Sequence, residues 1–95
     1  MYKNRTAARV DSNQQAIVKK LRSCGISVQT NMDDILVGYK GKNFQFEIKD
    51  PKTLKKDGNF KAGTIKPSQV ELKKNWKGHY SIVTTFEQIL EDIKQ

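Results

Sequence analysis

The chain has 95 residues and 36% hydrophobic content, enough for one small domain, residues 1–95, with a single modest core. No run of about 18 apolar residues could span a bilayer and no leader pattern is present, so we expect a cytoplasmic protein. A lone cysteine, Cys24, excludes an intramolecular disulfide and a cysteine-rich zinc site. The net charge of +8 favours a polyanion such as nucleic acid as partner, although the lysines could equally serve only solubility.

The first third of the chain predicts a helix followed by a strand. Residues 1–10 form a basic arm that includes Arg5 and Arg9. A helix is expected over about residues 12–24, with Gly25 suited to ending it. Its apolar residues at helical spacing are Ile17, Val18, Leu21 and Cys24. Residues 26–30 then alternate apolar and polar side chains, which indicates a strand.

The middle of the chain predicts a hairpin and then a long loop. Residues 35–39 and 44–49 indicate two strands, joined by a tight turn at 40–43 that contains Gly41. From 50 to 66 no periodicity is visible, and a loop of that length in a small domain is usually functional or mobile. Its lysines are Lys52, Lys55, Lys56, Lys61 and Lys66.

The last third predicts a helix, a strand and a helix. Pro67 suits the first position of a helix that runs to about Trp76. A strand is expected over residues 79–83, and Thr84 with Glu87 forms a capping box for a last helix. We expect Val70, Leu72, Trp76, the phenylalanines and Cys24 to be buried. The order is therefore α-β-β-β-α-β with a C-terminal helix, an α/β fold.

Three polar residues on the predicted hairpin carry the chemistry. Asp34 opens one strand, and Glu47 and Lys49 lie two positions apart near the end of the next. Since alternate side chains of a strand share a face, Glu47 and Lys49 point the same way. The opposite face then carries Phe44, Phe46 and Ile48. Two carboxylates can hold a divalent metal, and a nearby ammonium can orient a water or steady a phosphate.

The ordered set of motifs resembles the PD-(D/E)xK nuclease fold, with a mixed four-stranded sheet, and within it the stand-alone VRR-NUC domains of phages and bacteria. Together the motifs cover nearly the whole chain from residue 9 to residue 90. They are Arg9-Val-Asp-x-Asn-Gln, Asp34-Ile-Leu-Val-Gly-Tyr-x-Gly, Phe46-Glu-Ile-Lys-Asp50, Pro67-Ser-Gln-Val-Glu and Trp76-x-Gly. One departure is Asp33, which stands where the family usually has proline.

The resemblance implies a metal-dependent nuclease that uses Mg²⁺, with Mn²⁺ as a substitute. Asp34 and Glu47 would be direct ligands, and the backbone carbonyl of Ile48 would add a third oxygen. Lys49 would orient the attacking water and stabilise the charged transition state. Without the motifs, the simpler interpretation is that these acids are ordinary strand-edge residues paired with Lys49.

Further site residues follow from the same resemblance. Gln14 would hydrogen-bond a water of the metal, with Gln15 as the alternative. Gln69, at the start of the second helix, would orient Lys49 or contact the DNA backbone. The residues expected to bind DNA are Arg5, Arg9, Lys52, Lys55, Lys56, Lys61 and Lys66.

The expected function is a DNA endonuclease selective for branched substrates such as Holliday junctions, in a bacterial or phage-infected cell. One small domain has one site, so symmetric cutting of a junction would need a homodimer. Two alternatives stay open. The first is a general or restriction-type nuclease that acts on plain duplex. The second is a catalytically silent module that only binds nucleic acid.

Overall fold

The computed structural model describes residues 12–31 and 34–95. The basic arm with Arg5 and Arg9, and also Asp33, lie outside the described residues. The elements are α1 (Ser12–Ser23), β1 (Ser27–Asn31), β2 (Asp34–Tyr39), β3 (Lys42–Ile48), a 3-10 turn (Pro51–Thr53), α2 (Pro67–Asn75), β4 (Tyr80–Val83) and α3 (Phe86–Ile93). The predicted order of helices and strands is confirmed.

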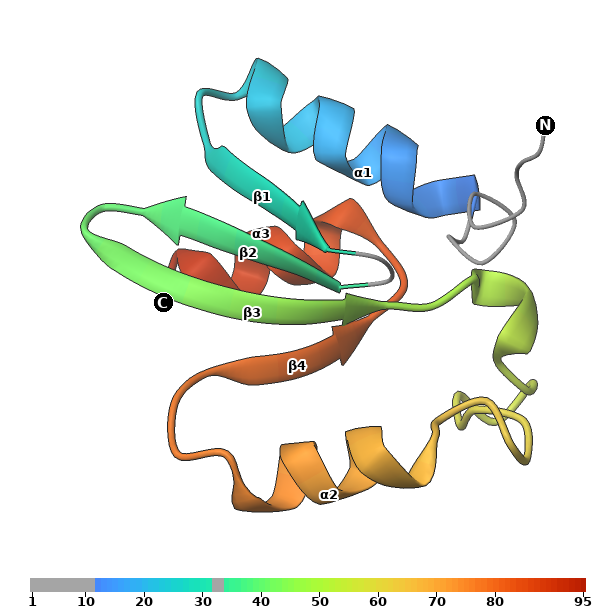
Figure 1. Ribbon diagram of the computed structural model, residues 1–95. Coiled ribbons are helices and arrows are strands. Elements are labelled where there is room, and N and C mark those ends of the chain that lie inside the picture. The colour runs from blue at the N-terminus through green and yellow to red at the C-terminus, as the bar shows by residue number, and fades with distance from the viewer. Residues whose placement is uncertain (1–11, 32–33) are drawn as a thin grey trace, which may run out of the picture.

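The four strands form one open, mixed sheet in the order β1-β2-β3-β4 (Figure 1). Short connections make β1–β2 and β2–β3 antiparallel. The chain then leaves β3, passes through α2 and returns as β4, which pairs parallel to β3. Such a crossover is what a parallel pair requires, because a short turn can only reverse the chain. The predicted α/β class with a mixed sheet is confirmed.

One face of the sheet forms the core, and α1 and α3 cover it. The strands contribute alternate residues to this face, as the period of two requires. Phe46, at its centre, is fully buried. The buried cluster comprises Ile17, Val18, Leu21, Ile26, Ile35, Val37, Phe46, Ile48, Val83, Ile89 and Ile93. Helix α2 contributes nothing to this cluster and packs beside β4 instead.

Two ends of helices show how local sequence sets the fold. Gly25, at φ +77°, ends α1, and the Ile26 N–H donates to the Leu21 carbonyl at 3.1 Å, as in a Schellman motif. The capping box predicted for the last helix is wrong by one residue. Thr85 caps α3, with its Oγ1 accepting from the Gln88 N–H at 3.2 Å. The capping-box pattern fits both Thr84 with Glu87 and Thr85 with Gln88, one residue apart. Thr84 is instead buried where β4 ends.

Several burial predictions are wrong, and α2 accounts for most of them. Val70 and Trp76 are each 53% exposed, because α2 packs mainly beside β4 and buries Gln69 there. Cys24 is exposed because it lies where α1 ends and the chain turns. Among the described residues, none of the helices combines the length and apolar character needed to cross a membrane.

Candidate functional site

Asp34 and Glu47 face each other on neighbouring strands, on the side of the sheet away from the core. They are direct partners in the antiparallel register of β2 and β3. Cross-strand partners project to the same face, so the two carboxylates share one surface. Glu47 is 4% exposed, whereas Asp34 is partly buried beside an open groove of about 300 Å³. The fold therefore brings together the two acids that the sequence singled out.

The backbone at this point directs a third oxygen toward β2, the strand that carries Asp34. The Lys49 N–H donates to the Val83 carbonyl on β4 at 2.9 Å. Because a trans peptide points its C=O opposite to its N–H, the Ile48 carbonyl is directed away from β4, toward the side of β2. The same alternation makes Asp34 and Glu47 a non-hydrogen-bonded pair, the kind whose Cα atoms lie closer, at about 4.5 Å.

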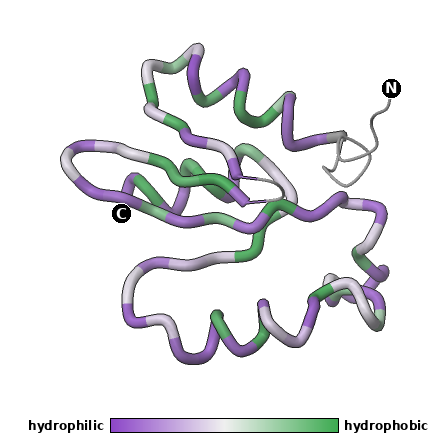
Figure 2. Tube along the Cα trace, viewed as in Figure 1, coloured by the Kyte–Doolittle hydropathy of each residue, from purple (hydrophilic) through white to green (hydrophobic). Residues whose placement is uncertain are grey.

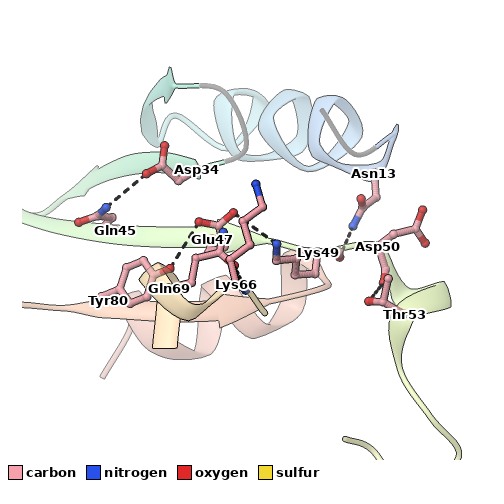
Figure 3. A network of polar contacts seen from close by, with 10 residues as sticks. All are labelled: Asn13, Asp34, Gln45, Glu47, Lys49, Asp50, Thr53, Lys66, Gln69 and Tyr80. Atoms are coloured by element: carbon pink, nitrogen blue, oxygen red, sulfur yellow. Dashed lines mark hydrogen bonds and ion pairs between the residues drawn. The ribbon is translucent and has the colours of Figure 1, made fainter. Parts of the chain in front are cut away.

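Polar side chains hold the two carboxylates in place (Figure 3). The Tyr80 hydroxyl donates to Oε1 of Glu47 at 3.4 Å, and Lys49 Nζ lies 3.9 Å from Oε2. Gln45 Nε2 donates to Oδ2 of Asp34 at 3.3 Å. Glu47 and Lys49 point the same way, as predicted for alternate residues of a strand, and both are buried. A buried ion pair of this kind loses much of its stabilisation when either partner is removed.

Asn13, which lies in the Arg9-Val-Asp-x-Asn-Gln motif but was given no role from the sequence, joins the start of α1 to the ends of two strands. Its Nδ2 donates to the Lys49 carbonyl at 3.0 Å and to the Thr84 carbonyl at 3.1 Å. These bonds fix the chain where it leaves β3 and β4, next to the carboxylates. The signal in the sequence was its place beside Gln14 in the first turn of the helix. Tyr80 was also missed, because the pairing of β4 with β3 is not readable from local pattern.

We expect Asn13→Ala to lower the free energy of unfolding by about 1–3 kcal/mol, because two partly buried carbonyls lose their donor. Urea denaturation measures the change. Gln15→Ala is the matched control, since Gln15 is exposed on the same helix and should change stability by less than about 0.5 kcal/mol. Equal stability of the two variants would contradict the structural role given to Asn13.

The structure distinguishes the two candidate glutamines of the first helix and locates Gln69. Gln14 is 4% exposed, whereas Gln15 is exposed. Gln69 is buried at the start of α2, where its Oε1 accepts from the Lys66 N–H at 3.0 Å. Its own N–H donates to the Lys66 carbonyl at 2.9 Å. Gln69 thus closes the first turn of α2, and its contact with Lys49 or DNA stays a prediction.

The 50–66 segment leaves β3 directly at the site and is more regular than predicted. Asp50 caps the 3-10 turn by accepting from the Lys52 N–H at 2.9 Å. Leu54 and Phe60 then form an antiparallel bridge, so the chain doubles back on itself. All five lysines named for this segment are exposed on this backbone, and Figure 2 shows the segment as largely hydrophilic.

The ends of the helices add to the electrostatics of this region. In Figure 1, α1, α2 and α3 all begin at the end of the sheet where β2 starts and β3 and β4 finish. The N-terminus of a helix carries unpaired N–H groups and a partial positive charge, which favour anions. This end of the molecule therefore combines two acids, which suit a cation, with surroundings that suit a phosphate.

The donor set at the acids fits Mg²⁺ better than zinc. Asp34, Glu47 and the Ile48 carbonyl supply oxygen, the ligand type that Mg²⁺ prefers while it keeps several waters. In the described part of the chain no three His, Cys, Asp or Glu side chains gather, as a closed structural zinc site would require.

Comparison of the chain with known protein families, curated proteins and solved structures gave no match. The functional argument therefore depends on the arrangement of these residues.

Proposed function

We propose that this protein is a metal-dependent endodeoxyribonuclease of the PD-(D/E)xK type, related to the VRR-NUC domains. The observation that carries the proposal is the register of β2 and β3, in which Asp34 lies opposite Glu47. Lys49 completes the set on the same face, with its ammonium 3.9 Å from the Glu47 carboxylate. An ordinary surface ion pair would not require two acids opposite each other and a largely buried lysine.

Each residue has a defined task in this proposal. Asp34, Glu47 and the Ile48 carbonyl would hold the metal. When bound, Mg²⁺ supplies positive charge at the phosphate and makes its water more acidic. Lys49 orients the attacking water and stabilises the negative charge that develops on the phosphate. Gln45 and Tyr80 hold the two carboxylates in orientation, the usual role of outer-shell partners.

DNA is the proposed substrate because the charge of the molecule suits it. The net charge of +8 raises the local concentration of polyanions, and exposed lysines of the 50–66 segment follow directly after the site. We further propose that two copies act as a homodimer on branched DNA such as a Holliday junction. A two-fold pair would present one site to each of two strands.

A substrate panel tests the function. Purified protein is incubated with four-way junction, plain duplex and single-stranded DNA in Mg²⁺ or Mn²⁺. Preferential cutting of the junction supports the full proposal, and equal cutting of all three points to a general nuclease. No cutting with either metal, together with retained binding, would favour the silent binding module. Sedimentation of the protein as a monomer on junction DNA would count against the dimer.

We expect the double variant Lys55→Ala with Lys56→Ala to weaken DNA binding and its salt dependence. Both side chains are exposed, and the Lys55–Asp57 ion pair at 4.0 Å is too exposed to hold the lysine back from phosphate. Each phosphate that is no longer neutralised lowers the log–log slope of affinity against salt by about 0.9. Lys19→Ala with Lys20→Ala, on α1, removes equal charge as a control. An unchanged slope in the first variant would limit those two lysines to solubility.

A further inference from the structure

The tip of the β2–β3 hairpin lies at the end of the sheet opposite the start of β2 and the end of β3, where the carboxylates are (Figure 1), and it carries a second group of lysines. Lys40 and Lys42 from the hairpin and Lys94 from the end of α3 line one groove of about 410 Å³, and we call these three residues the distal lysines. Lys40 and Lys42 also border a second groove of about 550 Å³, on the side of Ser27 and Asn43. None of the described side chains lining either groove is acidic.

The conformation of Lys40 is a second, independent observation. Lys40 and Gly41 form a two-residue turn between the paired residues Tyr39 and Lys42. Their φ angles are 51° and 78°, as in the type I′ turn that favours Asn-Gly. A left-handed lysine is strained, and asparagine tolerates that region much better. The chain therefore keeps a cation where stability alone would favour asparagine, and such strain often marks a functional position.

The surface between the two ends of the sheet suits a nucleic acid. On the face that carries Asp34 and Glu47, the described residues of β1, β2 and β3 that lie beside them or toward the tip are uncharged. They are Ser27, Gln29, Asn31, Leu36, Gly38, Asn43 and Gln45. This stretch offers hydrogen-bonding side chains and no charge that would repel a phosphate backbone.

The separation of the two ends defines the expected footprint. From Asp34 to Tyr39 the strand advances five residues, about 17 Å at about 3.3 Å per residue. Phosphates follow one strand of a duplex at about 3.4 Å intervals along the axis. The distal lysines therefore lie about five base pairs from the carboxylates for a duplex laid along β2 and β3.

We propose that the distal lysines bind the phosphate backbone of nucleic acid about five base pairs from the phosphate held at the carboxylates. The kind of ligand rests on the proposed function, whereas the spacing rests on the hairpin. The three lysines line one groove, and the Lys40 ammonium lies over the Tyr39 ring, 5.4 Å from its centroid.

Lys40→Asn gives the sharpest test, because it should raise the stability of the protein and lower its affinity for DNA. The variant should raise the Tm by about 2–5 °C, since asparagine suits the left-handed turn. It should also bind long duplex more weakly, with the salt slope reduced by about 0.9 because one phosphate is no longer neutralised. A lysine with only a structural role would not lower affinity while stability rises.

The measurement is fluorescence anisotropy in EDTA, with a duplex of about 16 base pairs and a stem-loop of about 4 base pairs. The variants are Lys40→Asn and the triple variant Lys40→Asn, Lys42→Gln, Lys94→Gln. The control is Lys19→Gln, an exposed lysine on α1. We expect the slope of the triple variant to fall by up to about 2.7 (three phosphates at about 0.9 each) on the long duplex and to stay unchanged on the stem-loop.

An unchanged slope on the long duplex would overturn the proposal. An equal fall of the salt slope on the long duplex and on the stem-loop would also overturn it. So would a fall in Lys19→Gln equal to that in Lys40→Asn, since either result would mean that the distal lysines act only through the net charge of the protein. The assay needs no metal, so it separates the two proposals. A wild-type protein that binds in this length-dependent way but never cuts would contradict the proposed nuclease activity and leave the binding role of the distal lysines intact.

Discussion

Glu47→Gln is expected to reduce cleavage by about 10³-fold or more while the protein still folds and binds DNA. Glutamine keeps the size of the side chain and can still accept from the Tyr80 hydroxyl, which lies 3.4 Å from Oε1. The change removes one of the two negative charges that would hold the metal. Loss of outer-shell partners alone costs about 10–100-fold in such sites, and loss of a direct ligand should cost more.

Three measurements separate this outcome from a loss of folding. Cleavage of junction DNA in Mg²⁺ gives the activity, calorimetric titration gives the affinity for Mg²⁺, and thermal unfolding gives the stability. Glu91→Gln, an exposed acid on α3, is the matched control and should leave all three unchanged. A Glu47→Gln protein that cuts at the wild-type rate would remove Glu47 from the site and with it the proposed metal centre.

The fold was largely predictable because its elements are short and their patterns are local. Alternation along residues 44–49 separated Glu47 and Lys49 from the apolar face. The structure confirms this split, because Phe46 and Ile48 belong to the core cluster and Lys49 Nζ lies 3.9 Å from Glu47. Gly25 marked the end of α1 because a left-handed residue was needed there. Both features depend on residues close in sequence, where backbone preference and side-chain period act directly.

The pairing of the two acids depended on a detail that local pattern left open. A four-residue turn over 40–43 would pair Tyr39 with Phe44, and Asp34 would then lie opposite Lys49. The observed turn has two residues, Lys40 and Gly41, so Asp34 lies opposite Glu47. Both registers keep the same faces, so hydrophobic alternation could not distinguish them. The left-handed conformation of Lys40 decided the geometry of the site.

The remaining errors involve contacts between segments far apart in sequence. Trp76 was expected in the core, but α2 lies beside β4 and meets little apolar surface there. The bonds of Asn13 to the ends of β3 and β4 join residues 36 and 71 positions apart. The bond of Tyr80 to Glu47 spans 33 positions. Such contacts follow from sheet order, which residue patterns do not encode.

Lys49→Met is expected to reduce cleavage by about 10²–10³-fold, the usual effect of losing one group that stabilises charge in the transition state. Methionine retains much of the aliphatic bulk and removes the ammonium. The variant should keep its affinity for Mg²⁺, because both carboxylates remain. This pattern is the reverse of Glu47→Gln, in which metal affinity falls together with cleavage.

The same substitution has a metal-dependent effect on stability that tests the site without any substrate. Without metal, Lys49→Met removes the ammonium that lies 3.9 Å from the buried Glu47 carboxylate, which faces Asp34, and this loss should cost about 3–5 kcal/mol. Added Mg²⁺ should recover much of this loss, because a ligand that binds only the folded state stabilises it. Thermal unfolding with Mg²⁺ and with EDTA measures the difference, and Lys74→Met, exposed on α2, is the control.

The double variant Glu47→Gln, Lys49→Met completes the test. With neither charge present, its stability without metal should return toward that of the wild type, because neither member of the ion pair is then buried without the other. Its Tm should no longer respond to Mg²⁺, since Asp34 remains as a single carboxylate. A pair with a purely structural role would instead give a Lys49→Met protein whose Tm is equal in Mg²⁺ and EDTA. That result would leave Glu47 and Lys49 as an internal ion pair and remove the physical basis for metal-assisted cleavage at this end of the sheet.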